Sequence, residues 1–396
     1  MIPELRRSFN AAFTEERYAA THRRLERRLS CQIHFRMCET PVFLPRPLRD
    51  EMVRSAGEIL AQLATPVELA VSRRAIPPGL DVPGEGPHPF CAQVDFGVVE
   101  EGGRLVARLI ELQAFPSLYG FQFVQAQEQR ADCPDGEGLD FLLSDLDEDG
   151  YVRVVGEAIT NGHPKENVVL LDIDPPTQKT YPDFAATQML WGIRSVCPTK
   201  VEKRGRELWY DRDGRPTRIL RIYNRVIFDE LLGKSIELPF SFTDPLEVEW
   251  AGHPNWYFRW SKHSLPRLKH TTVPEAHFLS DLSRWPDDLT GWVLKPLFSF
   301  AGSGVRVDIT AADLDAIPRQ RRKEFLLMRK VAYAEAVASP YGGGSKVEVR
   351  VMFLWKDGKP LPVTTLARLS QGKMMGVAFN KDKKWVGSSS CLWPIA

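Results

Sequence analysis

The sequence lacks any long run of apolar residues. No stretch approaches the roughly 18 apolar residues that a membrane-spanning helix needs, and the first residues have no apolar core of the kind that a secretory signal carries. The six cysteines are scattered without a CxxC pair, which is typical of reduced, mostly buried thiols in a long chain. We therefore expect a cytoplasmic protein with no membrane partner.

The chain also has little net charge. Its formal charge is +1 and 26% of its residues are charged, so the composition gives no reason to expect nucleic acid as a partner. The exception is the N-terminus, where apolar residues at roughly helical spacing accompany seven arginines: Arg6, Arg7, Arg17, Arg23, Arg24, Arg27 and Arg28. An amphipathic helix with a solvated basic face is the favoured interpretation, and an arm that binds nucleic acid is the other.

Several familiar motifs are missing. No GxGxxG opens a helix after a strand, so a Rossmann dinucleotide site is not supported. No HRD or DFG element is present, which lowers the case for a kinase-like phosphotransferase. Asp145, Asp147, Asp149 and Gly150 resemble the start of an EF-hand loop, but Gly156 occupies the position of the bidentate glutamate. We read that stretch as an acidic turn.

The stretch from Gly291 to Ile309, GWVLKPLFSFAGSGVRVDI, predicts a strand, a small flexible loop and a return strand from Val305. Lys295 ends the first strand, and Gly302 and Gly304 allow the loop to take positive φ. Backbone N–H groups of such a loop could cradle a phosphate, with the lysine as a point charge. An ordinary β-hairpin with a solvated lysine is the alternative.

A second hairpin carries carboxylates. Phe90–Val99 and Leu105–Phe115 read as strands joined by a Glu-Glu-Gly-Gly turn. Asp95 lies on the first strand, and Glu111 and Gln113 share one face of the second. Buried carboxylates are costly unless paired or bound to a cation, and oxygen donors of this kind suit Mg²⁺. A half-exposed sheet face with polar residues outward explains the pattern equally well.

The middle of the chain reads as a small α/β unit. The apolar run Asn167–Asp174 predicts a buried parallel strand, followed by a helix over Tyr181–Ile193, a strand over Thr217–Tyr223 and a helix over Val226–Leu232. Arg225 stands where the last strand gives way to its helix. It is a candidate for binding an anion, or else for a salt bridge between domains.

The C-terminal part reads as a helix followed by an antiparallel meander. The helix is expected over Ala311–Arg321 and the strands over Glu324–Val331, Val347–Trp355, Leu361–Leu369, Met375–Phe379 and Trp385–Leu392. Glu348 and Arg350 lie on the second of these strands, and Arg368 lies near the end of the third.

Together, these stretches resemble the ATP-grasp fold in the permuted order of the synthetase domain of the glutathionylspermidine synthase family. VDFGVV with Asp95 is similar to the family's RFDF strand, and ELQAFPSL with Glu111 and Gln113 to its EYNADTPTSL. WVLKPLFSFAGSGVRV is similar to its strand–KP–glycine loop, and SKHSLPRL with Lys262 to its NKALLPLL. Gln113 stands where the family has Asn, and Gln93 where it has Arg. The resemblance covers about three quarters of the chain, from Phe90 onward.

The resemblance implies a mixed α+β and α/β protein whose antiparallel sheets clamp a nucleotide cleft beside the small α/β unit. The expected segments are 1–89, mostly helical; 90–165, with the metal hairpin; 166–260, the α/β unit; and 261–396, the ATP-binding lobe. It also implies ATP and Mg²⁺ as cofactors. The residues expected to contact ATP are Lys262, Lys295, Ser299, Gly302, Ser303, Gly304, Lys330 and Val331. The expected Mg²⁺ ligands are Asp95, Glu111 and Gln113.

The implied activity is ADP-forming ligation of a small-molecule or peptide carboxylate to an amine through an acyl phosphate. Arg225 and Arg368 are then the candidates for binding the substrate carboxylate or the acyl phosphate. A nucleotide-binding module without ligase activity is the main alternative, and Gln113 is the feature that favours it. A phosphotransferase acting on a hydroxyl group is the third.

Overall fold

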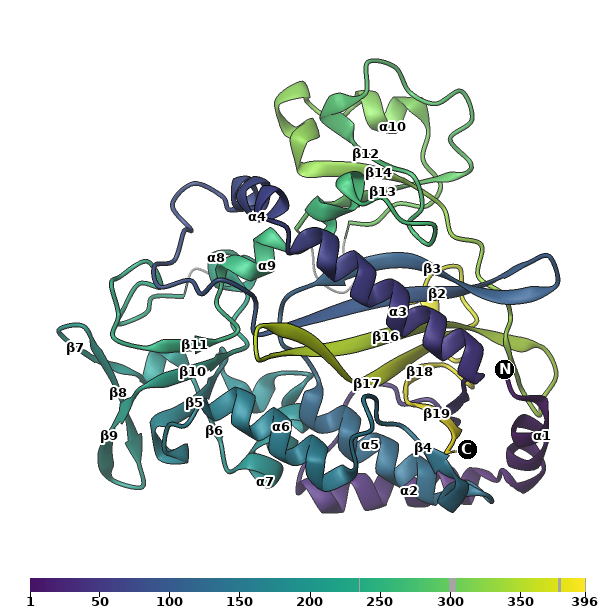
Figure 1. Cartoon of the computed structure of the whole chain (residues 1–396), viewed down its shortest axis with the longest axis horizontal. Coiled ribbons are helices and arrows are strands. Elements are labelled where there is room, and N and C mark those ends of the chain that lie inside the picture. Colours follow the sequence, from purple (N-terminus) through teal and green to yellow (C-terminus); the bar gives the residue numbers. More distant parts are fainter. Residues whose placement is uncertain (235, 299–303, 377–378, 396) are drawn as a thin grey trace.

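The computed structural model describes residues 1–234, 236–298, 304–376 and 379–395. Several of its helices lie beside a large sheet, and a smaller lobe with a helix of its own projects from the sheet's edge (Figure 1). The helices are α1 (Pro3–Ala12), α2 (Glu15–Leu29), α3 (Arg46–Leu63), α4 (Pro66–Ser72), α5 (Tyr119–Ala131), α6 (Glu148–Thr160), α7 (Tyr181–Trp191), α8 (Phe228–Lys234), α9 (Asn255–Arg259) and α10 (Ala311–Asp315). In these described ranges, no helix is both long and apolar enough to cross a bilayer.

The main sheet is antiparallel and carries the two motifs with carboxylates and arginines. Its strands run in the order β18 (Gly387–Ser389), β17 (Lys359–Ser370), β16 (Gly344–Lys356), β2 (Cys91–Glu101) and β3 (Arg104–Gln113), and β15 (Val337–Ala338) also pairs with β16. Strand β2 is buried on both faces. Its apolar face contributes Val94, Phe96 and Val98 to the largest core, and the opposite face carries Gln93 and Asp95.

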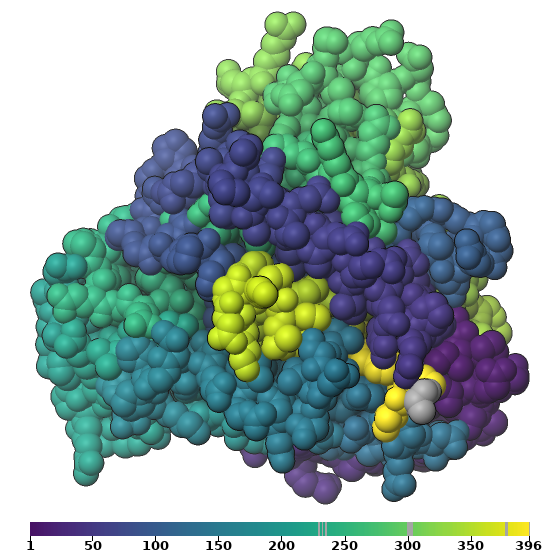
Figure 2. Space-filling model, in the orientation of Figure 1, coloured from purple at the N-terminus to yellow at the C-terminus, as the bar shows by residue number. Residues whose placement is uncertain are grey.

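Helix α3 crosses the main sheet and contacts β3, β16 and β17 (Figure 1). Figure 2 shows this helix lying over the face of the molecule, with the turn between β16 and β17 emerging beside it. Its buried residues repeat at helical spacing, at Met52, Ala56, Ile59 and Leu63. Such a stripe is the face by which an amphipathic helix packs on a sheet.

The predicted α/β unit is confirmed as a parallel sheet in the order β11 (Glu249–Ala251), β10 (Arg221–Asn224), β5 (Val168–Leu171) and β6 (Arg194–Val196). Every residue of β5 is fully buried, and burying one such Val or Leu contributes about 1.5–3 kcal/mol. A small meander, β7 (Glu202–Arg204), β8 (Glu207–Arg212) and β9 (Arg215–Ile219), stands beside it. The single strand predicted over Thr217–Tyr223 is therefore two strands, which belong to different sheets.

The projecting lobe is built on the antiparallel sheet β12 (Ala276–Phe278), β14 (Phe325–Arg329) and β13 (Trp292–Pro296). The predicted return strand from Val305 is only a bridge between Leu294 and Arg306, because β14 is the long partner of β13. The helix predicted over Ala311–Arg321 ends at Asp315, shortly before Pro318, which cannot continue a helix.

The two ends of the chain meet in a short sheet of β1 (Val42–Phe43), β19 (Cys391–Pro394) and β4 (Leu139–Asp140). The strand predicted over Trp385–Leu392 is accordingly divided between β18 and β19. The strand predicted over Met375–Phe379 is wrong where the structure describes it, because Met375 and Gly376 lie in bends.

The basic N-terminal segment forms α1 and α2, as predicted. Thr14 caps α2 by accepting a hydrogen bond from the Arg17 N–H. Much of its basic face is paired within the molecule: Arg24 and Arg28 both bind Glu128 of α5. The acidic turn is also confirmed, since the Asp147 side chain accepts from the Gly150 N–H and caps α6.

Candidate active site

Strand β3 brings the two predicted ATP lysines together. Its pairing with β2 skips one residue, Ile110, between Glu111 and Leu109. Such a bulge leaves a backbone group outside the ladder, and the Ile110 carbonyl accepts a 2.9 Å hydrogen bond from Lys295 Nζ. Lys295 thus reaches β3 from the end of β13, in a different sheet.

Lys262 approaches the same strand along its outer edge. The Leu109 N–H donates to the Thr272 carbonyl at 2.8 Å, and the Ala114 N–H donates to the Trp260 carbonyl at 3.1 Å. These bonds bind the segment 260–272 along β3. Lys262 Nζ consequently lies 3.7 Å from Glu111 Oε2, whereas Lys295 binds the backbone of the same hairpin.

Asp95 is held by two arginines. Arg350 donates from Nε to Oδ1 at 2.6 Å and from Nη2 to Oδ2 at 2.7 Å, and Arg368 Nη2 donates to Oδ2 at 2.5 Å. Arg350 is the direct cross-strand partner of Asp95 on β16. The side chains of Asp95 and Arg350 are 1% and 8% exposed, so this is a buried bidentate pair.

Glu348 extends the network. It accepts from Arg368 Nη2 and, at 2.9 Å, from the Tyr333 hydroxyl. The Tyr333 ring lies over Gly97, where an added Cβ would come within 2.7 Å of the ring. Glycine at position 97 therefore allows the tyrosine to reach the sheet face.

The amides of Gln93 and Gln113 are oriented by Arg350. Arg350 Nη1 donates to Gln93 Oε1 at 2.8 Å, and a guanidinium can only donate, so this atom is the amide oxygen. Gln113 must then donate its Nε2 to the same oxygen, at 2.7 Å. Gln93 Nε2 in turn donates to the Ser117 carbonyl at 2.9 Å.

We call these eight residues the cation–carboxylate cluster: Asp95, Glu111, Gln113, Lys262, Lys295, Glu348, Arg350 and Arg368. Burial opposes ionisation of Glu111, but Lys262, Arg368 and Lys295 outweigh it and lower its pKa. Burial also lowers the pKa of Lys295, with Glu111 opposing and Lys262 adding to the effect.

Burial raises the pKa of Glu348, and the charge of Asp95 adds to it. The carboxylates Glu348 and Asp95 in turn outweigh burial and raise the pKa of Arg368. The cluster is thus one coupled set of charges that share a buried sheet face.

The structure brings together six of the predicted site residues: Lys262, Lys295, Asp95, Glu111, Gln113 and Arg368. Gly304 takes φ +72°, and an added Cβ there would lie 2.8 Å from Pro296 Cγ, so a glycine is needed beside the Lys295 strand. Ser299, Gly302 and Ser303 lie outside the described residues. Lys330 and Val331 follow β14, where the chain leaves the lobe, and the Lys330 N–H donates to the Gly291 carbonyl at 2.8 Å.

Arg225 lies outside the cation–carboxylate cluster, next to the parallel sheet. Its Nη1 pairs with Asp183, and although burial opposes its charge, this carboxylate raises the pKa of Arg225. Asp183 also accepts from the N–H groups of Leu118, Gly120 and Phe121, at 3.0 Å each, at the start of α5. Arg225 therefore forms a salt bridge, but not the one between domains that the sequence left open, because Asp183 belongs to the same predicted segment, 166–260.

Sequence reasoning assigned no role to Arg350, Glu348, Tyr333 or Gln93. The alternation of β16 already placed Glu348 and Arg350 on one face, and that signal could have found them. Tyr333 gave no such signal, because only the tertiary contact with Gly97 brings it to the cluster.

The residues predicted to hold Mg²⁺ do not fit that ion as they are arranged. Both Asp95 oxygens accept bonds from guanidinium groups, which leaves Glu111 and the Gln113 amide oxygen as donors. Within the described ranges, no group of three or more His, Cys, Asp or Glu residues could hold a metal ion. Arg350 occupies the position beside Asp95 that a cation would take.

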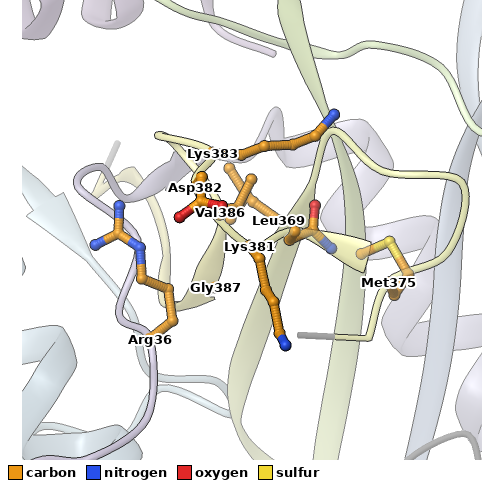
Figure 3. Close-up of a pocket in the computed structure, with 9 residues that line it drawn as sticks. Arg36, Leu369, Met375, Lys381, Asp382, Lys383, Val386 and Gly387 are labelled. Carbon is orange, nitrogen blue, oxygen red and sulfur yellow. The ribbon is translucent and has the colours of Figure 1, made fainter. Parts of the chain in front are cut away.

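A pocket of about 230 Å³ lies between Arg36 and the loop that leads to β18 (Figure 3). Lys381, Asp382 and Lys383 line it together with Leu369. Successive side chains of a strand point to opposite faces, so Leu369 faces away from the cluster that Arg368 joins. The pocket is therefore separate from the cation–carboxylate cluster.

Comparison with known proteins supports the fold class. Among solved structures, a glutathione synthetase-like effector (GSS30) from Globodera pallida, in its apo form, aligns over 96% of this chain and 96% of its own, with a TM-score of 0.59 and 11% identity. At that identity the likeness shows the fold alone. No family model matches the chain, and no curated protein matches it. The predicted mixed α/β, ATP-grasp-like fold is thus confirmed.

Proposed function

We propose that this chain binds ATP at the cation–carboxylate cluster and is an ADP-forming ligase that joins a carboxylate to an amine. The observation that carries the proposal is the convergence of Lys262 and Lys295, from separate segments, on Glu111 beside Arg368. Phosphoryl transfer needs positioned cations around a highly charged transition state, and two buried lysines held against β3 supply them. The glutathione synthetase-like fold of the structural neighbour is consistent with this class of chemistry.

In the proposed reaction, a carboxylate oxygen of the acid attacks the γ-phosphorus of ATP. The bond from that phosphorus to the bridging oxygen breaks, and ADP leaves. The amine nitrogen then attacks the acyl carbon, the carbon–oxygen bond to phosphate breaks, and the nitrogen loses a proton to give the amide. Lys262, Lys295 and Arg368 stabilise the transferring phosphoryl group. The backbone at Lys330 and Val331 meets adenine.

Two measurements test the proposal. ATP should raise the melting temperature, because a ligand that binds only the folded state stabilises by about 2.7 kcal/mol at a hundredfold excess over Kd. Hydroxylamine should trap the activated acid as a hydroxamate when peptides, thiol peptides or amino acids are screened as acids. If ATP does not change the melting temperature, the proposed ATP site is wrong. A phosphorylated alcohol without hydroxamate indicates a phosphotransferase, and AMP with pyrophosphate indicates an adenylating enzyme.

A second function is favoured by one specific observation. The Arg350–Asp95 pair neutralises a carboxylate that the ligase resemblance assigns to metal binding. A nucleotide-binding module without ligase activity has no need of that carboxylate. In that case ATP binds, no acid stimulates ADP release, and Glu111→Ala hardly changes ADP release. In a ligase, Glu111→Ala removes nearly all turnover.

A further inference from the structure

We infer that this chain receives the phosphates of its nucleotide with a pair of guanidinium groups, Arg350 and Arg368, in place of a divalent metal. The inference rests on the proposed ATP function and specifies which cation that site uses. The two oxygens of Asp95 accept three charge-assisted hydrogen bonds from these arginines. A metal could bind Asp95 only by displacing them, and Arg350 would then remain buried without its partner, which is strongly unfavourable.

The net charge of the cluster supports the same inference. Within the described residues, Lys262, Lys295, Arg350 and Arg368 face the three carboxylates Asp95, Glu111 and Glu348, so the face is cationic by one charge. Without the two arginines the same face would be anionic, and a polyphosphate would need a metal to approach it. The arginines therefore supply the positive charge that the metal would otherwise bring.

Arg368 also has a hydrogen-bond donor that is not used within the described structure. Its Nε is buried and has no hydrogen-bond partner among the residues that the structure describes, while its Nη2 binds Asp95 and Glu348. A buried N–H without an acceptor is costly, and a phosphate oxygen would satisfy it with a charge-assisted bond. The Arg368 side chain is 34% exposed although Nε itself is buried, so a ligand reaches the guanidinium group directly and Nε after a shift of the side chain.

The remaining oxygen donors do not make a metal site by themselves. Glu111 is the single carboxylate of the predicted set that the arginines leave without a direct bond, and Lys262 lies 3.7 Å from it. Arg350 orients the Gln93 amide and, through it, Gln113, so losing Arg350 would disturb both glutamines. Mg²⁺ demands near-octahedral geometry and gives up its water reluctantly, so one carboxylate and one amide are too few ligands to hold it in the nucleotide-free protein.

The test measures ATP affinity by calorimetry on the full chain, in EDTA and in excess Mg²⁺. We expect the two affinities to agree within about threefold, since the site's own cations neutralise the phosphates. We also expect the electron paramagnetic resonance signal of added Mn²⁺ to be unchanged by the ATP-free protein. This second readout does not depend on turnover.

Two variants sharpen the test. Arg350→Met frees Asp95 and removes one positive charge, so ATP affinity in EDTA should fall by about tenfold or more and recover in part with Mg²⁺. Arg350→Lys keeps the charge without the bidentate geometry, and it should lie between the parent and Arg350→Met. Arg221→Met is the matched control: Arg221 is also a buried arginine, but it lies on β10 and pairs with Glu249.

The outcomes separate the two proposals. ATP binding that needs Mg²⁺, or tight Mn²⁺ binding by the ATP-free parent protein, overturns the inference and leaves the ATP function standing. An absence of ATP binding in both conditions overturns the ATP function and this inference with it. Equal loss of ATP affinity in Arg221→Met and Arg350→Met also overturns the inference, because the effect would then come from any buried arginine.

Discussion

Two buried arginine–carboxylate sites of this molecule look alike in sequence and differ in what they do. In the first, the side chains of Arg225 and Asp183 are 4% and 0% exposed. Asp183 also accepts hydrogen bonds from three backbone N–H groups at the start of α5. In the second, Arg350 and Arg368 hold Asp95, but lysines and a further carboxylate surround them, and the Arg368 side chain is 34% exposed. The Nε atoms of Arg225 and Arg368 both lack a partner among the described residues, so exposure is what distinguishes the two sites. A ligand can reach a partly exposed network, whereas a fully buried one stabilises the fold.

The largest expected effect is a loss of folding stability when the Arg225 site is disrupted. Arg225→Met leaves the Asp183 charge buried without its countercharge, and the free energy of unfolding should fall by about 3–5 kcal/mol. Urea denaturation measures it. The double variant Arg225→Met with Asp183→Asn should recover part of the loss. If Arg225→Met unfolds like the parent yet no longer binds ATP, Arg225 belongs to the functional site and the comparison fails.

Acid should weaken the parallel-sheet region through His253. Its Nδ1 accepts from the Asn255 N–H, its Nε2 faces the Pro83 carbonyl at 3.1 Å, and burial lowers the pKa of His253 to about 4 from 6.5. The folded state therefore disfavours the proton. This contribution is complete above pH 6.5 and is lost as pH falls from 6.5 towards 4, by up to about 3 kcal/mol.

Chemical denaturation at several pH values checks this expectation. His253→Gln cannot take up the proton, so its unfolding free energy should change less between pH 7 and about pH 4.5 than that of the parent. The exposed His277 offers a control, His277→Gln. An acid loss of the same size in parent and His253→Gln would show that another group carries it.

Lys295 should reverse the pattern seen for Arg225, with little effect on folding and a large one on binding. Lys295→Met replaces a buried charge with an apolar side chain of similar length, so we expect the protein to remain folded. The ATP-dependent stabilisation, about 2.7 kcal/mol for the parent at a hundredfold excess over Kd, should disappear. Thermal melting with and without ATP measures it, and the exposed Lys356→Met is the control. An unchanged ATP response would exclude Lys295 from the site.

The smallest effect concerns the edge of the cluster. Tyr333→Phe removes the hydroxyl that donates to Glu348 and keeps the ring over Gly97, so the unfolding free energy should fall by about 1 kcal/mol. ATP affinity should change less than in Lys295→Met. A loss of ATP affinity as large as that of Lys295→Met would place Tyr333 within the binding surface and enlarge the site.

Local patterns were enough to predict the elements that carry the cluster. Alternation defined β2, β3, β16 and β17, and an uninterrupted apolar run identified β5, because burial on one or two faces leaves a direct trace in the order of residues. The same patterns placed Asp95, Glu111 and Gln113 on one hairpin and set Lys295 at a strand end. They failed where a segment divides between sheets, as between β18 and β19, since no residue marks which sheet a short strand joins.

The tertiary structure alone decided how the charges pair. Arg225 and Arg368 both stand near strand ends in the sequence, but their carboxylate partners lie 42 residues and 273 residues away along the chain, at Asp183 and Asp95. Spacing cannot report contacts over such separations. The Ile110 bulge that offers its carbonyl to Lys295 has no sequence signature either. The sequence by itself determined which charged groups share a face of one strand. The packing of the lobe against β3 and the register of β16 decided which of them meet, because only the folded chain fixes those distances.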